Sequence, residues 1–450
     1  MAVPSGHYST RGTVALQIAR MRRGHRRPLT LAALRVRSFR FQWSADLLTS
    51  WAFEMETLVL GWYVMIHTGS VLLLTAFASL QFLGTLAAPM FGVLGDRLGG
   101  RTMLCAMRAF YVGLAVVLAL LALTGTLTPL AVLVVAALGG IVRPNDLVMR
   151  NTLIGETIPP AAMIGALGMS RATADSARVG GALAGAGLST MLGVGVTYLV
   201  VAGLYVASLG LTLGVARRTP VPDPAAATRT IPLPSPSGWR DLLEGLRHVL
   251  TTPELLAMML LAFLINLTAY PASSGLLPYI AREVYRVDAT GLGWLAASFA
   301  FGGLLASIAI VLTGGTRHPE RSTLACTAVW YALLLGFGQA TSLGAGLVVL
   351  LAAGFAQNVA MISMMATLLA AGGQGFRGRV MGVRMLAVYG LPLGLIASGV
   401  LIERIGYPLT ITASAGLGLA CTVLIGARWR ASLWWRRPRP VPDASLAQRV

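Results

Sequence analysis

Residues 92–101 read GVLGDRLGGR and lie between two long apolar runs, at about 71–94 and 103–123. The stretch places Asp96 and Arg97 in a very short connection, and its glycines allow the tight turn that such a connection needs. Apolar runs of about 20 residues joined by short charged turns are typical of helices that cross a membrane. The number of such runs in the rest of the chain therefore decides the fold.

Apolar runs of this length recur along the whole sequence. Of its 450 residues, 56% are hydrophobic and 11% are charged, and the mean hydropathy of +0.74 excludes a soluble globular domain. The runs are continuous and lack the period-two alternation of a membrane β-barrel. We predict an all-α integral membrane protein with twelve transmembrane helices, at about 43–66, 71–94, 103–123, 129–154, 163–188, 194–216, 254–281, 290–313, 322–341, 344–371, 380–402 and 406–428.

The longest interruption between these runs divides them into two sets of six. It contains a proline-rich stretch followed by an amphipathic helix at about Trp239 to Leu250, which we expect to lie on the cytoplasmic membrane surface. Two pseudo-symmetric six-helix halves are the natural division. The predicted segments are a basic cytoplasmic arm at 1–42, the first bundle at 43–216, a linker at 217–253, the second bundle at 254–428 and a basic tail at 429–450.

The distribution of charge predicts the orientation in the membrane. The net charge is +19 and every basic residue is arginine; the excess lies in the arm, the linker and the tail. The alternate connections carry no charged residue, at 68–71, 124–129, 189–196 and 340–346. This asymmetry places both termini in the cytoplasm of a multi-pass protein of the cell membrane. Anionic lipid headgroups, rather than nucleic acid, are the expected partners of the basic ends.

The loop that decides the fold also resembles a known signature. Between its second and third helices the major facilitator superfamily carries G-x-L-a-D-r-x-G-r-r, which Gly92, Leu94, Asp96, Arg97, Gly99 and Arg101 match. The resemblance implies that fold, with a conformational latch on the cytoplasmic side formed by Gly92, Asp96, Arg97, Gly99 and Arg101. Arg317 and Arg321 repeat the two arginines at the corresponding turn of the second half. The alternative is an ordinary solvated charged turn.

Further stretches resemble one branch of that superfamily, the exporters grouped with the enterobactin exporter and called transmembrane secretion effectors. Examples are Leu60-Gly-Trp62, Arg150 to Pro159, Gly245-Leu-Arg247 and Arg377 to Gly382, and together they extend from about residue 40 to 430. The resemblance implies export of small organic molecules such as drugs, siderophores or secondary metabolites. The chain departs from the branch at Gly180-Gly181, where glycine is usually followed by proline.

Ionisable residues within the spans are candidates for proton coupling or substrate binding. Each is unfavourable by at least about 2.5–3.5 kcal/mol at bilayer depth, and burial favours the protonated form of a carboxyl group, as a proton carrier requires. Glu54 and Glu56 point about 200° apart on one helix, so at most one faces a central cavity, and we favour Glu56. The candidates are Glu54, Glu56, Arg143, Asp146, Asp175 and Arg178.

Two of these sets have an alternative interpretation. Arg143, Asp146 and Arg150 recur on one face of the fourth span, and Arg171, Asp175 and Arg178 on one face of the fifth. Both sets could be salt bridges that stabilise the first half, with Arg150 and Arg171 extending toward the cytoplasm. A cytoplasmic gate is the other role predicted near the ends of the spans, for Arg150, Glu156, Arg377 and Arg379.

The second half offers amides and methionines instead of charges in spans seven to ten. Methionine adapts to many ligand shapes, although such clusters also occur in ordinary packing. The predicted substrate cavity contains Asn266, Tyr270, Gln357, Asn358, Met361 and Met364.

The predicted function is therefore secondary active export of a small organic substrate by alternating access, through proton antiport. A proton-coupled uptake permease of the same fold and a non-transporting scaffold or sensor are the alternatives. No P-loop, nucleophile elbow or metal-ligand spacing is present, so we expect neither an enzyme nor a cofactor or metal. Protons and the substrate are the expected partners, and the chain is expected to be a monomer.

Overall fold

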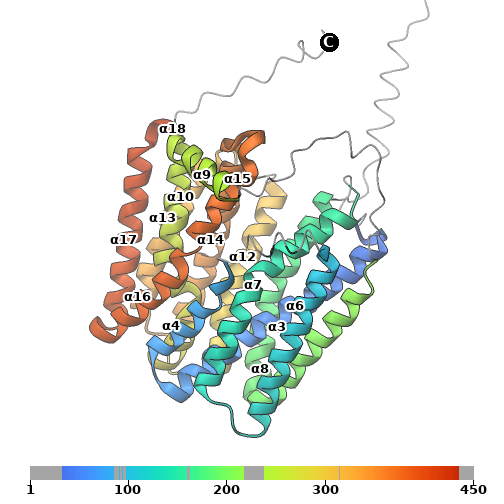
Figure 1. Ribbon diagram of the computed structural model, residues 1–450. Helices are drawn as coiled ribbons and strands as arrows, with labels where there is room; N and C mark the ends of the chain where they lie inside the picture. The colour runs from blue at the N-terminus through green and yellow to red at the C-terminus, as the bar shows by residue number, and fades with distance from the viewer. Residues whose placement is uncertain are drawn as a thin grey trace, which may run out of the picture.

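The computed structural model describes residues 33–85, 91, 94, 98–159, 163–216, 238–313 and 315–434. Within these residues all regular structure is helical, and the helices run side by side in one bundle (Figure 1). Three predicted latch residues, Gly92, Asp96 and Arg97, lie outside the described residues. The side chains of Glu156 and Arg377 also lie outside them.

The first half contains the helices that follow one another from α3 to α8. A glycine with a positive φ of 77°, Gly193, bends α8 and so divides it into the predicted fifth and sixth spans. The elements are η1 (Ala33–Arg35), α3 (Arg37–Thr68), α4 (Val71–Leu80), η2 (Leu83–Thr85), α6 (Gly100–Leu123), α7 (Pro129–Thr157) and α8 (Met163–Leu213). The helix α3 thus begins inside the segment that we predicted to be the arm.

The second half begins with the amphipathic linker helix α9 (Gly238–Thr251), which packs against α10 and α15. The predicted seventh span is interrupted by two π-helical turns, η4 and η5, and the eleventh is formed by α15 and α16 in succession. The elements are α10 (Pro253–Thr268), η4 (Pro271–Gly275), α11 (Leu277–Tyr279), η5 (Ile280–Val284), α12 (Ala289–Thr313), α13 (Pro319–Gln339), α14 (Leu343–Ala371), α15 (Gly373–Ala387), α16 (Gly390–Ile405), α17 (Tyr407–Arg428) and α18 (Arg430–Trp434).

Eight helices in the described part of the chain are long and apolar enough to cross a membrane, and one of them is the bent α8. The remaining predicted spans correspond to α3, which carries several charges, to the short α4 with η2, and to α13. The all-α membrane fold is therefore confirmed, and the number of helices agrees approximately with twelve. The boundaries of the five predicted segments stay a prediction.

Each half has its own hydrophobic core. One cluster of buried residues comes from α3 to α8, and a larger one comes mainly from α10 to α17. In the first half the closest pair is α3 and α8, because Gly181 and Gly185 let the backbones approach: a Cβ on Gly185 would lie 3.0 Å from the Cα of Met55. The halves meet mainly through two helix pairs, α8 with α12 and α4 with α16.

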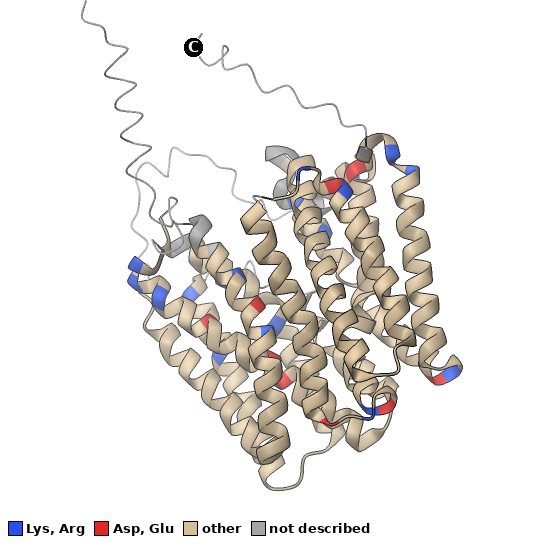
Figure 2. Cartoon of the chain, turned by 180° about the vertical axis from the view of Figure 1, so that it is seen from behind, with Lys and Arg blue, Asp and Glu red and all other residues tan. Residues whose placement is uncertain are grey.

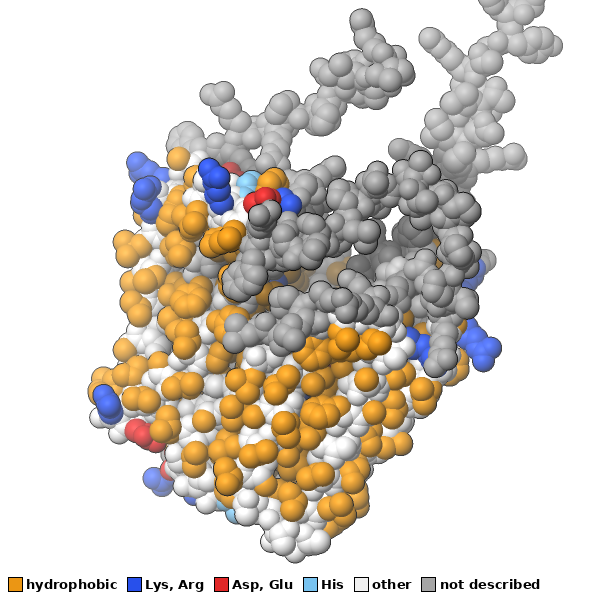
Figure 3. All heavy atoms as spheres, viewed as in Figure 1, with side chains coloured by type: hydrophobic (Ala, Val, Ile, Leu, Met, Phe, Trp, Pro, Cys, Tyr) orange, Lys and Arg blue, Asp and Glu red, His pale blue; other side chains and the backbone are white. Residues whose placement is uncertain are grey.

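The outer surface of the bundle is apolar. Leucine and valine side chains are exposed on its sides, among them Leu130, Val311 and Leu312 (Figure 3). Charged residues lie at the two ends of the bundle, and a further set lies in its body, mostly in the first half (Figure 2). An apolar belt with polar ends matches a lipid bilayer, in which buried charges need partners inside the protein.

Candidate functional site

Asp46 belongs to a cluster of four buried charges in the first half. Asp46 of α3 forms an ion pair with Arg108 of α6 and lies 3.5 Å from Nε of Arg150, which also pairs with Asp146 one turn earlier on α7. The side chains are at most 8% exposed. Two acids and two arginines leave the cluster without net charge, as burial of this depth requires.

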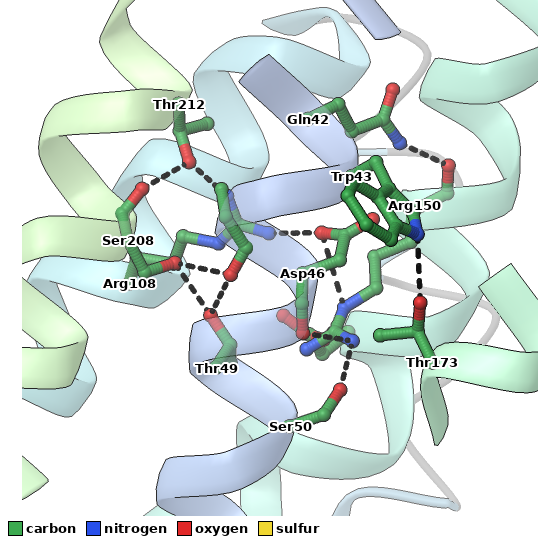
Figure 4. Close-up of polar contacts among 12 residues, drawn as sticks. Gln42, Trp43, Asp46, Thr49, Ser50, Arg108, Arg150, Thr173, Ser208 and Thr212 are labelled. Atoms are coloured by element: carbon green, nitrogen blue, oxygen red, sulfur yellow. Dashed lines mark hydrogen bonds and ion pairs between the residues drawn. The ribbon is translucent and has the colours of Figure 1, made fainter. Parts of the chain in front are cut away.

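Neutral side chains add hydrogen bonds to this cluster (Figure 4). Arg108 donates to Thr212 Oγ1, and Arg150 donates to Ser50 Oγ at 2.8 Å. Nearby, Gln42 Nε2 donates to the Arg150 carbonyl oxygen at 2.9 Å. The contacts join α3, α6, α7 and α8, so we expect the four helices to move as one body.

A second charged group surrounds Glu56. Arg143 Nη2 lies 3.0 Å from Glu56 Oε2, and the hydroxyl of Tyr205 donates to the same oxygen at 2.7 Å. Arg143 also donates to Gln81 Oε1 at 2.7 Å and to Thr57 Oγ1 at 3.0 Å. Beside this group is a cavity of about 10 Å³, room for roughly one water molecule. Glu56 is therefore enclosed within the first half.

The third group lies where the two halves meet. On α8, Asp175 Oδ2 is 3.4 Å from Nε of Arg171, and Asp175 Oδ1 is 3.9 Å from Nη1 of Arg178. From the other half, Ser307 Oγ of α12 donates to Asp175 Oδ2 at 3.2 Å, and Arg171 Nη2 donates to Asn358 Oδ1 of α14 at 3.3 Å. Asp175 is 4% exposed, whereas about half of each arginine side chain is exposed.

Glu54 belongs to this third group rather than to the second. Its Oε1 lies 4.0 Å from Nε of Arg178, and its side chain is 38% exposed. Glu54 and Glu56 therefore have separate surroundings, as their spacing predicts. Glu56, the one favoured for a coupling or substrate role, is 16% exposed, and that role stays a prediction.

In the second half, Tyr270 and Gln357 form a polar pair opposite α8. Gln357 Nε2 donates to the Tyr270 hydroxyl at 2.6 Å, and the Tyr270 ring packs edge-on against Trp330 at 5.2 Å. Arg384 of α15 lies within electrostatic range of both Tyr270 and Arg171. Of the other predicted cavity residues, Met364 is fully buried in the core, Met361 is partly buried, and Asn266 donates to the Ala262 carbonyl oxygen.

The structure brings some of the predicted residues together and separates others. Arg143 pairs with Glu56 rather than with Asp146, and Arg150 is buried beside Asp46 instead of extending toward the cytoplasm. Arg379, a predicted gate residue, pairs with Glu244 of α9 at 3.0 Å. The described latch residues are Gly99, which precedes α6 at φ 82°, and Arg101, which donates to the Leu213 carbonyl oxygen at 2.6 Å.

Sequence reasoning missed three charged residues: Asp46, Arg108 and Arg384. Asp46 and Arg108 lie near the beginnings of their predicted spans, where a charge is expected to reach the membrane surface. The sequence offered one signal for pairing them: Asp46 and Arg108 have opposite charges and lie a similar number of residues from the beginning of their spans. Arg384 follows Arg377 and Arg379 closely and is inconspicuous among these basic residues.

No group of three or more histidine, cysteine, aspartate or glutamate side chains that could hold a metal ion occurs among the described residues. The arrangement instead offers carboxylates beside arginines, which can exchange a proton or bind a charged ligand.

Two helical halves with an apolar exterior and charged groups at their junction match the architecture of membrane transporters built from two related halves. A sequence profile of the Major Facilitator Superfamily matches residues 43–315, and the chain belongs to this superfamily. None of the curated proteins matches the sequence. The predicted membership in the enterobactin-exporter branch stays a prediction.

Solved structures of transporters share the fold. The nucleoside transporter NupG has a TM-score of 0.68 at 13% identity, over 87% of this chain and 99% of the other. A bacterial homolog of the human lysosomal transporter Spinster, in an inward-facing and unoccupied conformation, has a TM-score of 0.66 at 14% identity, over 90% of this chain and 99% of the other. The human organic anion transporter MFSD10 has a TM-score of 0.61 at 17% identity, over 86% of this chain and 99% of the other. These similarities show the fold. The match to the superfamily profile, together with the apolar helices, indicates a multi-pass membrane protein.

Proposed function

We propose that the protein is a secondary active transporter that exports a small organic molecule by alternating access in exchange for protons. The observation that supports this most directly is the position of Asp175. This buried carboxylate pairs with Arg171 and Arg178 of its own helix and accepts a hydrogen bond from Ser307 of the opposite half. A proton on Asp175 would remove the negative charge from the surface on which the two halves meet.

The consequence for the transport cycle follows from electrostatics. A neutral Asp175 no longer attracts the two arginines, which become available to other anions, and its contact with Ser307 weakens because a hydrogen bond to a charged group is the stronger kind. Protonation thus changes both the binding surface and the contact between the halves. Glu54, which shares Arg178 with Asp175, is the second coupling acid, and the enclosed Glu56–Arg143 pair is a further candidate.

The direction of transport rests on the resemblance to the exporter branch. The latch signature and the charges buried inside the spans both favour a working carrier over a scaffold, since a scaffold gains nothing from burying charges that are unfavourable in a membrane. The same proposal includes three further features. Both termini lie in the cytoplasm, the chain is a monomer, and its basic ends contact anionic lipid headgroups.

The test uses inverted membrane vesicles with an acidic interior and a pH dye inside. For the parent protein, adding a transported compound raises the internal pH while the compound accumulates. In Asp175→Asn we expect the pH gradient no longer to drive accumulation, while exchange of labelled for unlabelled compound continues. Glu403→Gln is the control, because Glu403 is exposed at the end of α16.

Two results would contradict the proposal. Gradient-driven accumulation at the parental rate in Asp175→Asn would remove that residue from the coupling mechanism. Accumulation in right-side-out vesicles only, with the gradient directed inward, would identify an uptake permease instead.

A further inference from the structure

The central group of charges at the junction of the halves has an excess of positive charge. It contains three arginines, Arg171 and Arg178 of α8 and Arg384 of α15, and two carboxylates, Asp175 and Glu54. The two carboxylates both lie beside the arginines of α8. The group therefore has a net charge of one positive, in contrast to the neutral cluster around Asp46.

Arg384 accounts for this excess. Within the part of the chain that the structure describes, no carboxylate lies at ion-pair distance from its guanidinium group, and the charged side chain that acts on it is the like-charged Arg171 of the other half. Arg384 lies inside the long apolar stretch Arg379–Ile405, and its side chain is partly buried. The two guanidinium groups repel each other across the junction, and an anion bound near both of them would offset that repulsion.

The hydroxyl of Tyr270 is placed to complete an anion site. It accepts its hydrogen bond from Gln357, which leaves its own hydrogen free to donate to a ligand. All three arginines lie within electrostatic range of this one phenol group. Its ring is fixed edge-on against Trp330, so that the hydroxyl has a defined position.

The helix that carries Gln357 also offers an apolar side chain. Met361 is one helical turn from Gln357 on α14 and is only partly buried, so it shares the face of α14 that carries the amide. A methionine at this place can adapt to the apolar part of a ligand.

We propose that Arg384, Arg171 and Tyr270 bind the anionic group of the transported molecule, which is an organic anion with a carboxylate, sulfonate or phosphate and an apolar body beside Met361. This inference rests on the proposed transport function and specifies its substrate class. Guanidinium groups bind such oxyanions through two parallel hydrogen bonds. Because Arg171 and Arg384 belong to different halves, the bound anion would replace their repulsion by a bridge and draw the halves together.

The experiment measures the thermal unfolding of the purified protein with naphthalene-2-sulfonate and with the neutral naphthalene-2-sulfonamide. These probes have the same apolar body and differ in charge. We expect the sulfonate, and not the sulfonamide, to raise the unfolding midpoint of the parent. Arg384→Gln should weaken sulfonate binding roughly 10-fold to 100-fold, as loss of a hydrogen bond to a charged group implies, and Tyr270→Phe about 5-fold.

The control variant is Arg404→Gln, because Arg404 is exposed at the far end of α16; its sulfonate response should equal that of the parent. Arg384→Lys keeps the charge without the planar fork and should bind with intermediate strength, which separates loss of binding from loss of folding. The proposal is overturned if sulfonate and sulfonamide stabilise the parent equally, if Arg384→Gln keeps the sulfonate response, or if the parent responds to neither probe.

The vesicle assay distinguishes this inference from the proposed function. Selective sulfonate binding without proton exchange would refute proton antiport and leave the anion site in place. Proton-coupled transport of neutral compounds, without a sulfonate response, would refute the anion site alone.

Discussion

Asp46→Asn should destabilise the protein strongly, because it removes the negative charge that two buried arginines share. Asparagine is nearly the same size as aspartate, so the change is mainly one of charge. Arg108 is 0% exposed and has Asp46 as its ion-pair partner within the described residues, whereas Arg150 keeps Asp146. Breaking a buried pair by removing one partner is unfavourable by about 3–5 kcal/mol.

This energy corresponds to a fall in the unfolding midpoint of roughly 6–20 °C, if each kcal/mol lowers the midpoint of a domain of this size by about 2–4 °C. The assay is thermal unfolding of parent and variant in the same detergent. The control is again Glu403→Gln, because a substitution at this exposed position at the end of α16 should change the unfolding midpoint little.

A second variant separates charge from packing. Adding Arg108→Met to Asp46→Asn removes the unpaired charge, and we expect the double variant to recover part of the lost stability. The reasoning is refuted if Asp46→Asn unfolds within about 2 °C of the parent, or if adding Arg108→Met lowers the unfolding midpoint further.

Two further predictions concern contacts between helices. Gly181→Ala should destabilise the protein by about 1–3 kcal/mol, because its Cβ would lie 2.7 Å from the Cβ of Glu54 and press α8 away from α3. The control is Gly187→Ala on the same helix, where an added Cβ would have no atom within 4 Å. This control should show no such destabilisation in the same thermal unfolding assay. Arg282→Gln should open the end of the bundle where Arg282 donates to a carbonyl oxygen of α3, and a cysteine at Thr290 should then react faster with an impermeant thiol reagent. Equal reaction rates with and without this substitution would show that the contact does not hold that end closed.

The fold could be predicted from the sequence because it depends on properties that are local in the chain. Apolar runs of sufficient length identify helices whatever their neighbours are, and the Gly92–Arg101 loop identifies their order. The bend at Gly193 was also within reach, because a stretch too long for one span must turn and a glycine permits the necessary φ. The π-helical interruption of the seventh span depends on packing and had no comparable signal.

The partners of buried charges could not be predicted in the same way. Residues 143, 146 and 150 lie on one face of α7, which predicts pairing within the helix, and this holds only for Asp146 with Arg150. Arg143 instead reaches Glu56, because α3 packs against α7 and offers a carboxylate at the right depth. Such contacts depend on which helices become neighbours, and helical periodicity carries no information about that.

One helix, α8, carries three ionisable residues of the junction, Arg171, Asp175 and Arg178, and also forms part of the surface on which the halves meet. Its first part packs against α3 within its own half and against α12 of the other. A change of charge on this helix therefore acts directly on the moving contact, without a chain of intermediate residues. Evolution toward a new substrate or a new coupling ion could then proceed by substitutions on this single helix, while the neutral cluster around Asp46 keeps the rest of the first half intact.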